Sequence, residues 1–175
     1  MSWSSPMTAV AGATFTAAQF NQFVRDDLNE TAPAKATAAG QIFVSTAANA
    51  IAARVPDTAA VVTSQTTAST SYTDLATVGP TVTSTTGTAA LVMFGAQISN
   101  SGANSSRMSV AVSGASTVAA NDQWAAINVG TSALRIVSFH FFTGLTAGSN
   151  TFTAKYDVSA GTGTFVNREL AVIPL

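Results

Sequence analysis

A periodic apolar stripe near the N-terminus gives the clearest local pattern in the chain. Its members, Phe20, Phe23, Val24 and Leu28, recur at the spacing of one face of an α-helix. The pattern predicts a helix over about residues 17–29. Isolated helices shorter than about 12–15 residues are marginal in water, so this helix needs a surface on which its stripe can pack.

The residues around this helix carry start and stop signals. Thr16 is a good N-cap residue, and Gln19 three positions later completes the pattern of a capping box. Phe15 precedes the cap and can pack on Phe20 as a hydrophobic staple. Pro33 prevents the helix from continuing, because proline has no backbone N–H to donate.

A short β-hairpin is predicted over about residues 41–54. Its strands are Gln41–Val44, which is rich in β-forming residues, and the weaker run Ala50–Arg54. The turn between them contains Asn49, a residue type that tolerates the left-handed conformation. So small a unit buries little apolar surface by itself. We therefore interpret residues 1–60 as an N-terminal anchor made of an extended leader, the helix and this hairpin.

The remaining chain, residues 61–175, has the pattern of an all-β domain. Short runs rich in Thr and Val alternate with turns that contain Gly, Asn or Pro, which favours a sandwich or barrel. Eight or nine strands in this length fit a jelly roll. We predict a mainly β protein whose C-terminal domain is a jelly-roll-like β-sandwich. The expected strands are 61–66, 72–77, 80–85, 89–98, 107–113, 123–129, 133–142, 150–158 and 164–174.

Two of these strands depart from the usual alternation of apolar and polar residues. Residues 89–98 are apolar on both faces, and residues 134–142 are nearly so. One face of a sandwich strand packs in the core and the other meets solvent, so something must cover the second face here. A loop or the N-terminal helix is one possible cover, and a subunit interface is the other. The low charge of the chain favours the interface, with candidate residues Leu91, Met93, Phe139 and Phe141.

The composition narrows the possible partners. Only 9% of the residues are charged and the net charge is −1, whereas an average domain has about 25% charged residues. A nucleic-acid binder needs clustered Lys and Arg, which this chain lacks. No apolar run approaches the roughly 18 residues of a membrane helix, and no secretory signal is evident. Since low net charge favours association, we expect an assembly component with no nucleic-acid or membrane partner.

The sequence offers no constellation of catalytic residues. It has one His and no Cys, so zinc sites built from sets of these ligands are excluded. It also lacks the nucleophile elbow of hydrolases and a phosphate-binding loop with Lys. His140 lies within an aromatic run and is interpreted as a hydrogen-bonded structural residue, and Trp124 as a core residue. We expect no enzymatic activity, no metal and no cofactor.

Three segments, Phe15–Gly40, Gly40–Arg54 and Thr164–Leu175, carry distinctive motifs. They resemble segments of minor structural proteins of tailed bacteriophages, especially those that infect actinobacteria. Phe15–Gly40 is similar to the leader of these proteins. Gly40–Arg54 is similar to a hairpin repeated in phage fibre and decoration proteins, which often have Gly where this chain has Ala47 or Ala48. Thr164–Leu175 is similar to the last strand of the same group. The resemblance therefore touches the helix, the hairpin and the β-domain.

This resemblance implies a non-enzymatic virion protein that assembles symmetrically, often as a homotrimer. The expected function is capsid decoration (cement or head fibre) on the outer capsid surface, with synthesis in the host bacterial cytoplasm. Its partners would be the major capsid protein and further copies of itself. The alternative is a minor tail or tail-tip protein that binds the host surface through loops Asn100–Ser105 and Ser159–Gly163.

The N-terminal helix is the expected docking element for the capsid. The competing interpretation is that this helix packs on its own β-domain. The candidate docking residues are Trp3, Phe15, Phe20, Phe23, Val24 and Leu28.

Overall fold

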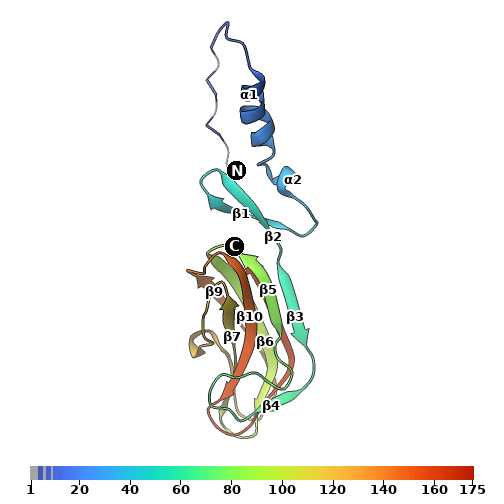
Figure 1. The fold of residues 1–175 in the computed structure, drawn as a ribbon. Helices are drawn as coiled ribbons and strands as arrows, with labels where there is room; N and C mark the ends of the chain where they lie inside the picture. The colour runs from blue at the N-terminus through green and yellow to red at the C-terminus, as the bar shows by residue number, and fades with distance from the viewer. Residues whose placement is uncertain (1–3, 6, 9) are drawn as a thin grey trace. The chain divides into compact units, whose positions relative to one another are not determined.

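The computed structural model describes residues 4–5, 7–8 and 10–175, so Trp3 lies outside the described residues. Contacts divide the chain into two compact units, Met1–Val55 and Pro56–Leu175, which we describe separately (Figure 1). The described residues are mainly β, with 51% in strands and 11% in helices. The predicted combination of a short helix, a hairpin and a β-sandwich is confirmed.

The N-terminal unit begins with the predicted helix start. Thr16 and Gln19 form a complete capping box: the Gln19 N–H donates to Thr16 Oγ1 at 3.2 Å, and the Thr16 N–H donates to Gln19 Oε1 at 2.9 Å. The rings of Phe15 and Phe20 meet edge to face, with centroids 6.2 Å apart. The local signals at the helix start are therefore confirmed.

The body of this helix is less regular than its spacing predicts. Helix α1 (Ala17–Phe20) continues as a π-helical segment, η1 (Asn21–Asp26), and helix α2 (Ala32–Lys35) follows. A π-helix closes each turn with one more residue than an α-helix, so it changes the angular spacing of the side chains. Phe20 and Leu28 remain exposed, while Phe23 and Val24 are half-buried.

The predicted hairpin is formed by β1 (Ile42–Ala47) and β2 (Ala50–Arg54), which pair in antiparallel register. Asn49 has a positive φ of 56° in the turn. The left-handed conformation expected for this residue is therefore confirmed.

The second unit consists of two packed antiparallel sheets. One has the strand order β5-β10-β7-β8, and the other has the order β3-β11-β6-β9 with β4 added beside β11. A 3-10 turn, η2 (Asp122–Trp124), precedes β8. The strands are β3 (Asp57–Val61), β4 (Gln65–Thr67), β5 (Thr81–Thr86), β6 (Ala89–Asn100), β7 (Ser105–Gly114), β8 (Ala126–Val129), β9 (Leu134–Thr143), β10 (Gly148–Val158) and β11 (Gly163–Pro174).

The pairing of these strands is nested. Apart from the short β4, the first strand β3 pairs with the last strand β11, and β5 pairs with β10. Inside them β6 pairs with β9, and β7 pairs with its successor β8. A long hairpin folded over on itself in this way is the arrangement of an eight-stranded jelly roll.

Two of the expected strands, 72–77 and 61–66, are wrong. Residues 72–77 form no strand; Thr73 makes one bridge to Tyr156, and Leu75 packs in the core. The expected strand 61–66 spans the end of β3, a short connection and the start of β4. Because β3 pairs with β11, residues 57–60 belong to the sandwich and not to the predicted anchor of residues 1–60.

The core lies between the inner faces of the two sheets. Successive side chains of a strand point to opposite faces, and in β6 the even-numbered residues point inward and are buried. The largest apolar members of the core are Val92, Phe94, Ile98, Met108, Val110, Phe152, Tyr156, Phe165, Leu170 and Val172.

Candidate functional site

The outer surface of the β3-β11-β6-β9 sheet is apolar, and we call it the apolar face. It exists because the odd-numbered positions of β6 and β9 point away from the core, and many of them are nevertheless hydrophobic. Register places Leu91 opposite Phe141 and Met93 opposite Phe139, so the four candidate interface residues lie on one surface. Its outward-facing apolar members are Leu91, Met93, Val137, Phe139, Phe141, Ala171 and Ile173.

These side chains are exposed to an unusual degree for their size. Phe139 is 71% exposed and Phe141 is 49% exposed. A fully buried aromatic side chain covers about 150–250 Å², so these two residues leave on the order of 200 Å² uncovered. Val137 and Met93 extend the same patch. Contiguous apolar patches above a few hundred Å² mark interaction sites.

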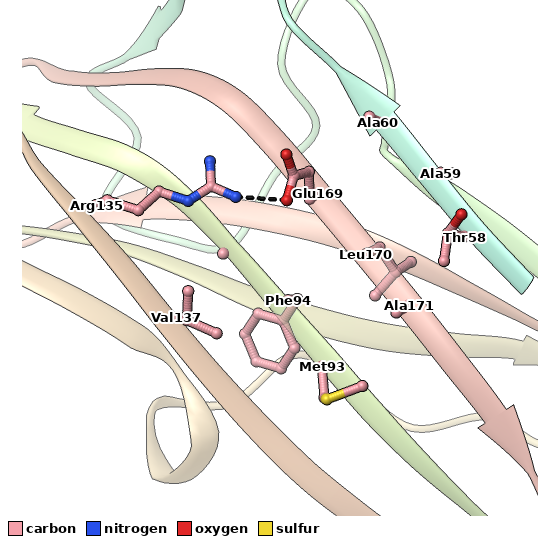
Figure 2. A pocket seen from close by; sticks show the side chains of 11 residues that line it. Thr58, Ala59, Ala60, Met93, Phe94, Arg135, Val137, Glu169, Leu170 and Ala171 are labelled. Atoms are coloured by element: carbon pink, nitrogen blue, oxygen red, sulfur yellow. Dashed lines mark hydrogen bonds and ion pairs between the residues drawn. The ribbon is translucent and has the colours of Figure 1, made fainter.

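A hollow of about 390 Å³ opens on the apolar face and is bordered by Met93, which stands opposite Phe139. Figure 2 shows the side chains that line the hollow. Ala60, Gly95 and Ala171 contribute little or no side chain to its lining, and Met93 and Val137 border it. A methyl group at Gly95 would collide with the Ile136 carbonyl oxygen on the adjacent strand β9. The close approach of β9 therefore requires glycine there, and the missing side chain helps to leave the hollow open.

Two charged side chains stand at the edge of this hollow. Arg135 Nη2 and Glu169 Oε2 form an ion pair at 2.6 Å. Figure 2 marks this ion pair with a dashed line. Arg135 also donates to the backbone carbonyl of Asn167. Since the two charges are paired with each other, they leave the apolar face without net charge.

The outer surface of the other sheet is polar along β5 and β10, and its exposed large apolar residues, Ile127 and Val129, lie on β8. Thr83 and Thr151 lie opposite each other on β5 and β10, and their hydroxyl groups share a hydrogen bond of 2.9 Å. Further along β10, Lys155 forms an ion pair with Asp74 at 2.7 Å. The sandwich thus presents one surface suited to water and one surface that water solvates poorly.

The N-terminal unit carries a second apolar surface. Phe15, Phe20 and Leu28 are exposed, whereas Phe23 and Val24 are half-buried. The structure thus leaves most of the candidate docking residues that it describes accessible, and Trp3 lies outside the described residues.

Two buried acids in this unit carry no signal of their burial in the sequence. Asp27 is buried, and its Oδ1 accepts a hydrogen bond from the Ser4 N–H at 2.9 Å. Glu30 is also buried and forms an ion pair with Lys35 at 2.8 Å, which lowers the pKa of Glu30. A Glu–Lys spacing of five residues carries no signal for this pairing, because it depends on the turn between the two helices.

His140 belongs to an aromatic cluster. Its ring stacks on Trp124 with centroids 4.3 Å apart and meets Phe142 edge to face at 4.6 Å. Burial lowers the pKa of His140. Trp124 is half-buried against the core, and its indole N–H donates to the Val110 carbonyl at 3.4 Å. Among the described residues, ring contacts hold the His140 side chain, in place of the expected hydrogen bonds.

The two loops expected to contact a host lie together at one end of the sandwich. The Ser101 N–H donates to the Thr162 carbonyl at 2.9 Å, and the Thr162 N–H donates to Ser101 Oγ at 3.0 Å. Asn100 Nδ2 donates to the Ala160 carbonyl at 3.1 Å. These polar groups therefore brace the loops against each other.

The part of the chain that the structure describes contains no group of three or more His, Asp or Glu side chains placed to hold a metal ion. None of its helices has both the length and the apolarity to span a bilayer.

No model of a known protein family matches this chain, and no curated protein sequence matches it. Its two apolar surfaces are consequently the best guide to what it does.

Proposed function

We propose that this chain is a non-enzymatic structural protein of a bacteriophage virion, a capsid decoration protein that binds the outer shell as a symmetric oligomer. The observation that carries the proposal is that each of two separate units exposes an apolar surface. Two such surfaces suit a protein that binds two kinds of partner, a shell and further copies of itself. The resemblance of three segments to phage structural proteins supports the viral setting.

In this proposal the N-terminal unit attaches the protein to the major capsid protein. Phe15, Phe20 and Leu28 are exposed on its helical part. Burial of apolar surface contributes roughly 25 cal/mol per Å², and a standard interface buries about 800 Å² on each partner. Linked copies bind more tightly than single ones, because the second attachment is intramolecular. Oligomerisation therefore strengthens a weak individual contact.

The copy number in purified virions tests the proposal. We expect the protein in proportion to the major capsid protein, measured by calibrated gel or mass spectrometry. A copy number that instead matches the tail or the portal vertex would overturn decoration in favour of the tail protein. Specific labelling of host cells by the purified protein would have the same consequence.

A substitution in the helix tests the docking element. Phe20→Asp places a charge at an exposed apolar position of the helix, so particles should lose the protein while its isolated form stays folded. Val62→Asp is the matched control, because Val62 is an exposed apolar residue of the sandwich unit, and it should leave particle binding unchanged. Equal binding of both variants would exclude the helix as the docking element.

A further inference from the structure

We propose that copies of this chain join through the apolar face, with Phe139 of one copy seated in the hollow beside Gly95 of the next. The inference deepens the proposed function and rests on it for the biological setting, since it names how the oligomer is held together. The contact itself is a property of the isolated protein and can be tested without a virion.

Phe139 has the features of a protruding contact residue. It lies on β9, which is the last strand of its sheet and pairs with β6 alone. Its side chain is 71% exposed although it is large and apolar. Buried aromatic side chains dominate the binding energy of protein interfaces. An aromatic ring in this position contributes little to the core and is well placed to contact a partner.

The hollow has the features of a receiving site. Its volume of about 390 Å³ falls within the range of pockets that hold small ligands, roughly 300–1,000 Å³. Its lining is largely apolar, from Ala60, Gly95, Ala171, Met93 and Val137 (Figure 2). A single aromatic side chain matches both this size and this chemistry.

Phe139 does not occupy the hollow of its own chain. It stands opposite Met93, which borders the hollow, and its ring remains exposed. Each copy therefore offers both an unfilled hollow and an unburied ring, on neighbouring parts of one face. Because the ring and the hollow lie on one face, two copies that meet face to face can each place a ring in the hollow of the other. Copies joined head-to-tail close into a ring only where the rotation between them closes.

The charge of the face favours a second copy over a charged partner. Arg135 and Glu169 neutralise each other at 2.6 Å, and the whole chain has a net charge of −1. Like charges that face each other across an interface cost several kcal/mol. Two copies of the apolar face avoid this cost, because the charged residues of each face are already paired with each other. The polar outer surface of the other sheet remains in water when the apolar face is covered.

The mass of the full chain in solution, by sedimentation velocity or light scattering at micromolar concentration, tests the interface. The wild type should sediment as an oligomer. Phe139→Asp removes the ring, and Ala171→Gln fills the hollow, so each variant should sediment as a monomer. Val129→Asp is the matched control, because Val129 is 67% exposed but lies on β8 in the other sheet. This control should retain the wild-type mass.

Mixing the two monomeric variants sharpens the test. The Phe139→Asp chain keeps an open hollow and the Ala171→Gln chain keeps its ring, so an equimolar mixture should regain association. Far-UV circular dichroism and thermal unfolding of each variant confirm that it is folded. A monomeric wild type, or an oligomer that survives both substitutions, would overturn the proposal.

The test of this interface and the test of capsid decoration can give different results. If the isolated protein associates as described but purified virions lack it, the interface stands and capsid decoration falls. If virions carry the protein and the isolated chain is a folded monomer, decoration stands and this interface falls.

Discussion

At the scale of single residues, Arg168 is the most consequential side chain of the sandwich. It is completely buried, and no ion pair with a carboxylate compensates its charge within residues 56–175. Its guanidinium donates to the carbonyls of Thr77 and Gly79, each at 3.3 Å, and to Gln65 Oε1 at 3.0 Å. It also lies over the ring of Tyr156 at 5.5 Å. Arg168 therefore ties the segment between β4 and β5 to the core.

Replacement of Arg168 by Ala should cost about 2–4 kcal/mol of unfolding free energy. The substitution leaves buried carbonyl groups without donors and creates a cavity, and both effects are destabilising. Urea unfolding of the two proteins measures the difference. Arg135→Ala is the control, because its exposed ion pair should contribute less than about 1 kcal/mol. Equal losses in the two variants would refute the structural role of Arg168.

His140 should make stability depend on pH. Burial lowers its pKa below the ordinary value of 6.5. As the pH falls below 6.5, the unfolded chain binds a proton before the folded chain does, so the free energy of unfolding decreases toward the folded pKa. Well above pH 6.5 His140 is neutral in both the folded and the unfolded chain, so its contribution to the free energy of unfolding is constant.

Denaturant unfolding between about pH 7.5 and pH 5 measures this effect, with His140→Phe as the comparison. The variant keeps an aromatic ring beside Trp124 but cannot titrate, so its stability should fall less over this range. Asp157 acts in the opposite direction, because burial raises its pKa and protonation then favours the folded state. Asp157 is present in both proteins, so the difference between them isolates His140. Parallel pH profiles would contradict the prediction.

Residue roles were predictable where they depend on nearby sequence. The capping box of Thr16 and Gln19 and the left-handed Asn49 follow from residue type and spacing, and all are confirmed. The burial of Arg168 was not predictable, because it depends on an irregularity in β11 between Val166 and Glu169 that turns this side chain inward. No local signal distinguishes this arginine from an exposed one.

At the scale of elements, the pairing of β6 with β9 depends on one glycine. A methyl group at Gly95 would collide with the Ile136 carbonyl and press on Val137. Gly95→Ala should therefore separate these strands locally and destabilise the protein by roughly 1–3 kcal/mol, as overpacking does. Thermal unfolding measures the loss. Gly102→Ala is the control, because its nearest neighbour is the adaptable side-chain amide of Asn104. Similar stability of both variants would show that β9 can shift without cost.

The strands themselves were only partly predictable. The runs that became β6, β7, β9, β10 and β11 are long and carry enough apolar residues to specify a core face. Residues 57–61 and 72–77 are both short and rich in small or hydroxyl side chains. Residues 57–61 form strand β3 because they pair with β11. Residues 72–77 form no strand. Pairing of this kind depends on chain segments about a hundred residues apart.

At the scale of the whole molecule, the sandwich was predictable from turn spacing, but its nested strand order was not. Alternation along a strand specifies which side chains face the core, and it says nothing about which strand lies alongside. The apolar face, unlike the strand order, was predictable, because residues 89–98 and 134–142 have hydrophobic residues on both faces and so require a cover. The hollow beside Gly95 appears only when β3, β11, β6 and β9 are placed in register.

The division into two units predicts that attachment and self-association can be separated. Every strand pair of the jelly roll lies within Pro56–Leu175, so a chain that begins at Pro56 should fold cooperatively by circular dichroism and thermal unfolding. It keeps Phe139 and the hollow, and should therefore have the oligomeric state of the full chain by light scattering. It lacks Phe15, Phe20 and Leu28, and should not bind particles that have been stripped of the protein. The full chain should rebind them. A shortened chain that binds such particles as well as the full chain would place the docking surface on the sandwich, and the apolar face would then be the first candidate for the capsid contact.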